Sequence, residues 1–131
     1  MKTKLTLAAR IGLGLIFTVF GLNGLVMFIN GTGFIPMPPP DPKTLEVMGG
    51  LFKLSYLMPL VKILEVTGGV LLLLGVYKRL ALVLLTPIVV NILGVHTFVD
   101  LAGLPLSLVI VGLTIYLIRS EWEAFSLLLE K

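Results

Sequence analysis

The sequence predicts an all-α integral membrane protein: a bundle of four transmembrane helices that forms one domain over residues 1–131. Three observations predict this fold class, and two of them are facts of composition. Hydrophobic residues make up 57% of the chain and charged residues only 13%, about half the charged share of a typical soluble domain. The third observation is a set of four apolar stretches, since a bilayer core of about 30 Å takes about 20 helical residues to cross. The chain has no cysteine, which excludes disulfides and thiolate chemistry.

We expect the four helices at about residues 5–29, 60–77, 80–99 and 104–120. Within the first, residues 11–29 are apolar, with only Asn23 strongly polar. A cleaved signal peptide is the competing interpretation, but the apolar run is long and no A-x-A-like site follows it. The second helix begins after Pro59, and the basic turn 77–79 separates it from the third. The fourth helix opens at Pro105, a residue favoured in the first helical turn.

The basic residues predict the orientation of the bundle. They precede the first helix, join the second to the third and end the fourth: Lys2, Lys4, Arg10, Lys78, Arg79 and Arg119. The positive-inside rule then places both chain termini in the cytoplasm. We therefore expect a multi-pass protein of the plasma (inner) membrane.

The segment 30–59, between the first two helices, contains too many prolines to form one continuous helix. Its second half can form a short helix, with Asp41 as N-cap and Pro42 in the first turn. That helix is apolar but too short and too charged to span a membrane. We interpret the segment as a Pro-rich loop and a short interfacial helix that cap the outer mouth of the bundle. The alternative is an amphipathic helix that floats on the outer surface.

Five polar residues from three of the helices fall at a common depth in the outer half of the predicted membrane. Counted at 1.5 Å per residue from the outer helix ends, they lie about 3 to 12 Å deep. They are Asn23, Lys62, Glu65, Asn91 and His96. Polar groups inside a membrane are costly, and ionisable ones usually mark function. The structural alternatives are hydrogen bonding between helices for the asparagines and, for Lys62, a side chain that reaches the headgroups.

Glu65 has the fewest structural explanations, because its short side chain reaches less far toward water. Lys62, about 60° away on the same helix, can share its face. His96 and Asp100 are four residues apart and can meet, which favours a charged imidazole. We predict Glu65 and His96 as catalytic residues, against structural alternatives for both, and Asn23, Lys62, Asn91 and Asp100 as ligand-binding residues. We predict no metal site, because Glu65 and His96 are too few ligands.

The central stretch of the chain, residues 59–82, reads PLVKILEVTGGVLLLLGVYKRLAL. It combines a proline-initiated helix that carries a glutamate, a Gly-Gly pair, an apolar run, a glycine and a basic turn. In this order of features it resembles the core of the DoxX family of small membrane proteins. Residues 10–25, RIGLGLIFTVFGLNGL, and residues 86–105, TPIVVNILGVHTFVD followed by GLP, fit the flanking parts.

The resemblance implies a four-helix membrane bundle, with Glu65, Asn91 and His96 at family positions. It also implies a link to redox complexes, since the family takes its name from association with the membrane subunit of a thiosulfate:quinone oxidoreductase. Most members have no established reaction, so the resemblance implies a fold more firmly than a function.

Three functions stay open. We expect the membrane subunit of a redox complex, which binds a small hydrophobic molecule such as a quinone in an outer-leaflet polar pocket. The alternatives are a small-molecule or proton-coupled transporter and a non-catalytic membrane scaffold for a partner enzyme. Any enzymatic activity would be that of an oxidoreductase subunit working with a redox partner protein, because the chain has no cysteine. The other expected partner is the lipid bilayer; nucleic acid is not expected, and the glycine-lined helix faces are compatible with a homodimer.

Overall fold

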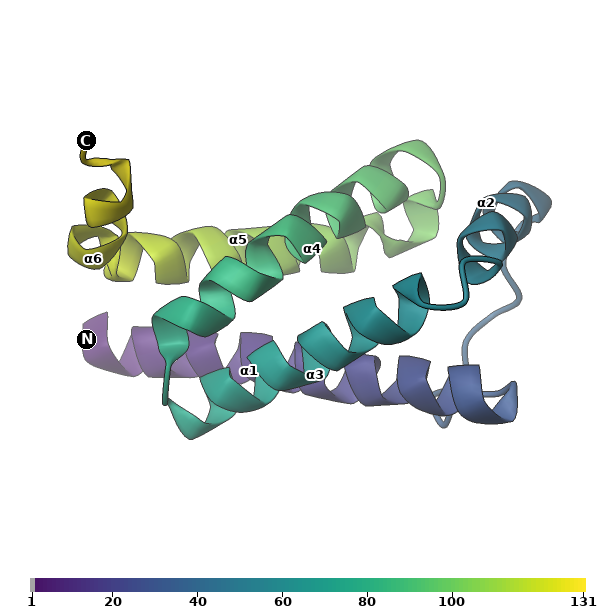
Figure 1. The fold of residues 1–131 in the computed structure, drawn as a ribbon, viewed down its shortest axis with the longest axis horizontal. Coiled ribbons are helices and arrows are strands. Elements are labelled where there is room, and N and C mark those ends of the chain that lie inside the picture. The colour runs from purple at the N-terminus through teal and green to yellow at the C-terminus, as the bar shows by residue number, and fades with distance from the viewer. Residues whose placement is uncertain (1) are drawn as a thin grey trace.

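A computed structural model describes residues 2–131, which contain helices and no strand (Figure 1). The elements, in chain order, are α1 (Lys2–Asn30), α2 (Pro42–Phe52), α3 (Leu57–Leu74), α4 (Lys78–Phe98), η1 (Leu101–Gly103), α5 (Leu104–Ser120), α6 (Trp122–Ser126) and η2 (Leu127–Leu129). Four helical segments are long and apolar enough to cross a membrane: α1, α3, α4 and α5 together with η1. The predicted all-α bundle of four transmembrane helices, with a short helix between the first two, is therefore confirmed.

The ends of α3 and α4 differ from the expected 60–77 and 80–99. Helix α3 begins at Leu57 and takes Pro59 into its first turn, where the missing N–H of proline breaks no helical hydrogen bond. It ends at Leu74 because Gly75, with φ 73°, adopts the left-handed conformation of a C-cap. Tyr77, with φ 49°, also lies in that region, so the chain reverses tightly and α4 starts directly at Lys78.

The four long helices run along one axis, and the chain visits them in the order α1, α3, α4, α5 (Figure 1). The contact between α1 and α3 is the most extensive, followed by α4 with α5, α3 with α4, and α1 with α5. We call the end where α1 and α4 finish and α3 and α5 begin the cap end. The opposite end, where α3 turns into α4 and both chain ends lie, is the turn end. Which end faces the cytoplasm stays a prediction.

Glycines let the backbones of α1 and α3 touch. A Cβ atom added to Gly14 would lie 3.0 Å from the carbonyl oxygen of Gly69, and one added to Gly69 would lie 2.7 Å from the backbone nitrogen of Thr18. Small residues at a helix crossing are the usual means by which membrane helices approach closely. The α1–α3 pair is therefore fixed in register by positions where no side chain fits.

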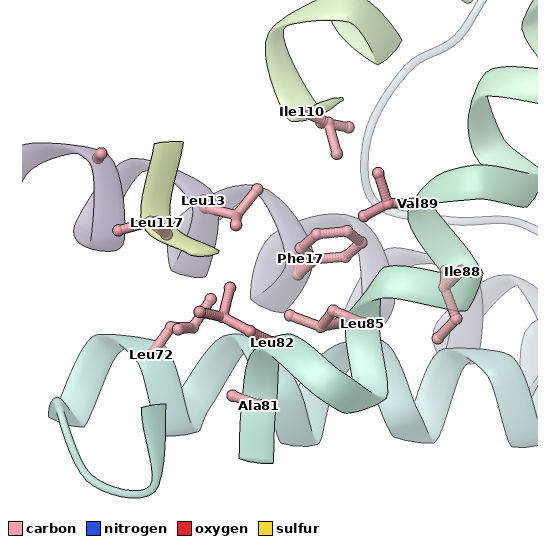
Figure 2. Packing of buried hydrophobic residues seen from close by; sticks show 11 residues of the cluster. Leu13, Phe17, Leu72, Ala81, Leu82, Leu85, Ile88, Val89, Ile110 and Leu117 are labelled. Carbon is pink, nitrogen blue, oxygen red and sulfur yellow. The ribbon is translucent and has the colours of Figure 1, made fainter. Parts of the chain in front are cut away.

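The apolar core lies in the half of the bundle nearer the turn end. Figure 2 shows Leu13 and Phe17 of α1 packed with Leu82 and Leu85 of α4, with Leu72 and Leu117 close by. Nearer the cap end, the buried residues of the long helices include the polar Asn23, Glu65 and Ser107 beside the apolar Val89 and Ile110. Buried polar side chains are thus more frequent toward the cap end than toward the turn end, where Thr114 is one of the few.

The segment between α1 and α3 is tied to the bundle at two points. Asp41 caps α2 as predicted, since its Oδ1 accepts from the backbone N–H of Thr44 at 2.9 Å. The backbone N–H of Ile35 donates to Asn23 Oδ1 of α1 at 2.9 Å. Lys43 Nζ of α2 donates to the carbonyl oxygen of Phe98, at the end of α4, at 2.8 Å. The predicted loop and short helix are present, and they hold to two different helices instead of floating free.

Candidate functional site

Lys62 and Glu65 form an ion pair inside the span of α3. Lys62 Nζ donates to Glu65 Oε2 at 2.9 Å and to Oε1 at 3.2 Å. The Glu65 side chain is 4% exposed and that of Lys62 is 22% exposed. The two residues thus share one face of the helix, as their spacing predicts, and the lysine is the member closer to the cap end.

Two glycines of α1 make room for this pair. A Cβ atom added to Gly24 would lie 2.5 Å from Lys62 Cδ, and one added to Gly21 would lie 3.2 Å from Glu65 Cβ. Gly21 and Gly24 are three residues apart and face α3 together. The stem of Lys62 and the base of Glu65 therefore rest on bare backbone of α1, which buries the carboxylate between the two helices.

The electrostatics of the pair follow from its surroundings. A lone charge within a membrane span costs several kcal/mol, whereas a lysine and a glutamate in contact are neutral together. Both hydrogen bonds of the pair run between residues of one helix. The hydrogen bonds of the pair consequently join no two elements of the fold, so its polar atoms can exchange a proton or accept a polar ligand while the aliphatic parts stay packed on α1.

Asn23 is buried in α1, at 3% exposure, but its Oδ1 accepts from the Ile35 backbone in the cap segment. Its amide also packs against Gly33, where a Cβ atom would overlap it. The hydrogen bond described for Asn23 thus goes to the loop and not to Glu65. In this structure Asn23 anchors the segment that covers the cap end.

His96 and Asp100 meet, as their spacing predicts, where α4 passes into η1. His96 Nδ1 lies 3.0 Å from the Asp100 carbonyl oxygen and 3.5 Å from Asp100 Oδ2. The imidazole ring packs against Gly103, where any Cβ atom would overlap it. These contacts all lie within the connection between α4 and α5, at the cap end but on the other helix pair from Glu65.

Asn91 is exposed on α4, and its Nδ2 donates to the carbonyl oxygen of Pro87, one turn earlier, at 2.9 Å. The structure therefore brings four of the six predicted site residues together in two pairs, Lys62 with Glu65 and His96 with Asp100. Asn23 and Asn91 stand apart, one bonded to the cap segment and the other to its own helix. The single pocket that would unite these residues stays a prediction.

Sequence reasoning missed a second charged cluster, at the turn end. Glu121 Oε1 accepts from Lys78 Nζ at 3.0 Å, and Glu121 Oε2 accepts from Arg79 Nε at 2.8 Å. The hydrogen bond from Arg79, and then that from Lys78, hold the pKa of the Glu121 carboxyl below its ordinary value. The available signal was an acidic residue just after the fourth helix, at the same membrane boundary as the basic turn 77–79.

Arg10 of α1 has its hydrogen-bond partners on α3. Its guanidinium donates to the carbonyl oxygens of Leu72 and Leu73 in the last turn of α3. The last carbonyls of a helix have no partner in a following turn; that of Leu72 also accepts from the Gly75 N–H, and a cation there complements the helix dipole. Arg10 thus caps α3 from α1.

Comparison with known proteins supplies a family. The family model for DoxX matches residues 5–99, which includes α2, α3 and α4 entire and nearly all of α1. No curated protein and no solved structure matches the chain.

Proposed function

Because the chain belongs to the DoxX family of membrane proteins, we propose that it is a membrane subunit that binds a small hydrophobic molecule, such as a quinone, beside Lys62 and Glu65. One observation carries the proposal. A carboxylate with a 4% exposed side chain lies inside a membrane-spanning helix and pairs with a lysine of that same helix. A buried pair that ties no two helices together is poorly explained by stability, and ionisable groups in spans usually mark a ligand or proton site.

The chemistry of the pair suits a quinone head group. Quinone carbonyl oxygens accept hydrogen bonds, and the Lys62 ammonium has three N–H donors. Under this proposal Lys62 donates to a carbonyl oxygen of the ligand from the cap end, where its side chain is partly exposed. Glu65, released from one of its two contacts with Lys62, accepts or delivers a proton as general acid or base. The proposal assigns His96 no contact with the ligand, because its ring is held beside Asp100 and Gly103.

The rest of the proposal concerns the source of electrons and the orientation of the protein in the membrane. The chain has no cysteine, so electrons for any quinone reaction would come from a redox partner protein. The basic residues at the turn end support a plasma (inner) membrane protein with that end in the cytoplasm. The site would then lie in the outer half of the bilayer.

Binding of decylubiquinone to the full chain in phosphatidylcholine nanodiscs tests the proposal. We expect saturable binding by the wild type and about tenfold weaker binding by Glu65→Gln, since a hydrogen bond to a charged group contributes about 1.5 kcal/mol or more. The matched control is Glu46→Gln, which changes an exposed glutamate of α2 and should bind like the wild type. Absence of binding by the wild type, or equal binding by Glu65→Gln, would remove the proposal.

A proton-coupled transporter is the second candidate, and the cap segment favours it. Its two anchors, on Asn23 of α1 and on the end of α4, lie at the end of the bundle nearer the ion pair; under this candidate the segment serves as a cover that opens during transport. Proton flux into proteoliposomes, present in the wild type and lost in Glu65→Gln, would favour transport. If neither flux nor quinone binding is found, the scaffold function is left.

A further inference from the structure

The turn end carries a hollow that the proposed function does not use. It measures about 330 Å³ and is lined by the last residues of α5 and the first of α6, together with Arg79 from the start of α4. The residues that matter chemically are Arg79, Arg119, Glu121, Trp122 and Glu123. Two guanidinium groups from different helices thus share one recess with an indole ring.

The charges in this hollow favour an anion. Both carboxylate oxygens of Glu121 are already occupied, one by Lys78 and one by Arg79. Arg79 uses its Nε for that bond, which fixes its guanidinium and leaves the terminal amino groups for another partner. Arg119 adds a second cation in the last turn of α5. The hollow itself is lined by these two arginines and by two glutamates, Glu121 and the exposed Glu123. Lys78 pairs with Glu121 from outside the lining, so the whole cluster carries one net positive charge.

The hollow also lies at the right depth for a lipid head group. Arg119 closes the fourth membrane-spanning segment and Arg79 opens the third. Beyond them, α6 and η2 turn away from the bundle axis at the end marked C in Figure 1. This short tail exposes Trp122 by 52% and three leucines, 127 to 129, by 62% to 73%. An apolar tail that turns aside at a membrane boundary is suited to lie among the upper acyl chains, and tryptophan favours that boundary.

We propose that this hollow binds the phosphate of an anionic phospholipid, with Arg79 and Arg119 donating to phosphate oxygens and Trp122 lying against the glycerol and upper acyl chain. Arginine forks match phosphate geometry, and basic recesses between membrane helices are a known means of holding anionic head groups. Free inorganic phosphate offers the same oxygens. The exposed indole and leucines beside the hollow favour the lipid, because only a lipid has acyl chains to cover them.

The test uses Trp122, the only tryptophan of the chain, as a reporter inside the site. The full chain is placed in phosphatidylcholine nanodiscs that contain either brominated phosphatidylglycerol or brominated phosphatidylcholine at the same mole fraction. We expect stronger quenching by the anionic lipid. Arg119→Gln should reduce the apparent preference about fivefold, the effect of one basic residue near a lipid surface. Arg119 makes none of the ion pairs described in residues 2–131, so this variant leaves the Glu121 contacts in place.

Two further variants test whether the lipid preference depends on positive charge and whether that charge must lie at the hollow. Lys43→Gln removes one positive charge at the cap end and should keep the lipid preference. Glu123→Gln removes the negative charge at the hollow and should increase it. Each variant is compared by its thermal midpoint, so that a folding defect is recognised.

Three results would overturn the proposal. One is equal quenching by the two brominated lipids. Another is an equal loss in Lys43→Gln and Arg119→Gln, which would show an effect of net charge with no site. The third is a shift of Trp122 fluorescence in detergent by inorganic phosphate at concentrations that also abolish the lipid preference, which would assign the hollow to a soluble anion. None of these outcomes bears on quinone binding at Glu65.

Discussion

Two glutamates at opposite ends of the bundle are both ion-paired, and they differ in almost every other respect. Glu65 is inside a span, 4% exposed, and pairs with a lysine three residues earlier on its own helix. Glu121 lies just beyond a span, 19% exposed, and pairs with two cations more than forty residues away in the chain. The first contact is local and buried, whereas the second is distant in sequence and close to water.

The difference shows what each pair does for the fold. The Glu121 contacts connect the start of α4 with the end of α5, and water can replace either partner. The hydrogen bonds of Glu65 connect nothing beyond one turn of α3, yet its carboxylate is too deeply buried for water to replace Lys62. A charge that is costly to bury and that holds no helices together is more readily explained by a ligand or proton site than by stability.

Removing one lysine from each of the two ion pairs should give the largest difference in the free energy of unfolding. Lys62→Met leaves a buried carboxylate without its cation and should lower the free energy of unfolding by about 3 kcal/mol, the low end for a broken buried pair, because Glu65 can take up a proton. Lys78→Met should cost under about 1 kcal/mol, since Glu121 keeps Arg79 near water. The measurement is unfolding in mixed micelles.

The double variant Lys62→Met with Glu65→Gln is the control for this prediction. It removes both charges, so most of the lost stability should return. Equal losses in Lys62→Met and Lys78→Met would show that burial does not distinguish the two pairs.

The glycines beneath the Glu65 pair give the next largest effect. Gly21→Ala should lower the free energy of unfolding by about 2 kcal/mol, because the new Cβ would lie 2.8 Å from Val66 Cγ2 and 3.1 Å from the Val66 backbone nitrogen. Gly112→Ala in α5 is the matched control, since a Cβ there meets nothing within 4 Å. It should be neutral or slightly stabilising, as alanine is the better helix former. A neutral Gly21→Ala would mean that α1 and α3 are not in tight contact beside the pair.

The two asparagines sharpen the comparison between buried and exposed polar groups. Asn23→Ala should cost about 1 to 2 kcal/mol, because it removes the buried acceptor of the Ile35 N–H. It should also speed proteolysis in the segment that Asn23 anchors. Asn91→Ala should change stability by less than about 0.5 kcal/mol, since that side chain is exposed and bonds within its own helix. Equal effects would contradict the loop-anchoring role of Asn23.

Local rules account for the part of the fold that the sequence predicted. Span length and hydropathy depend on consecutive residues, so all four long helices were predicted. The N-cap at Asp41 and the pairs Lys62–Glu65 and His96–Asp100 depend on spacings of three or four residues, so they were predicted too. The helix ends near Pro59 and Gly75 were misplaced, because proline is allowed in a first turn and a glycine C-cap shortens a helix.

What could not be predicted depends on contacts between distant segments. Asn23 and Asn91 look alike in sequence, and only the path of residues 30–41 and the outward face of α4 separate their roles. The contact of Arg10 with the end of α3 was not predicted, because nothing local in the sequence marks those carbonyls as its partners. Glu121 was passed over for the same reason, since Lys78 and Arg79 reach it only after the helices are packed.

The smallest predicted effect is the pH dependence of the Glu121 pair. The pKa of Glu121 is lowered in the folded state, first by Arg79 and then by Lys78, from an ordinary value of 4.5. Its contribution to stability is therefore complete above pH 4.5 and is lost as pH falls through the lowered pKa of the folded state. Because the pair lies near water, the whole contribution should be at most about 1 kcal/mol.

The measurement is the thermal midpoint of the wild type and of Glu121→Gln between pH 7 and pH 3. The gap between the two should be small at neutral pH and should close in acid, and high salt should narrow it at neutral pH because a pair near water is screened. Subtracting the variant removes every other group that titrates in this range. A gap that widens as pH falls would reverse the sign expected for a carboxylate stabilised by cations, and Glu121 could then no longer serve as the water-exposed counterpart of Glu65.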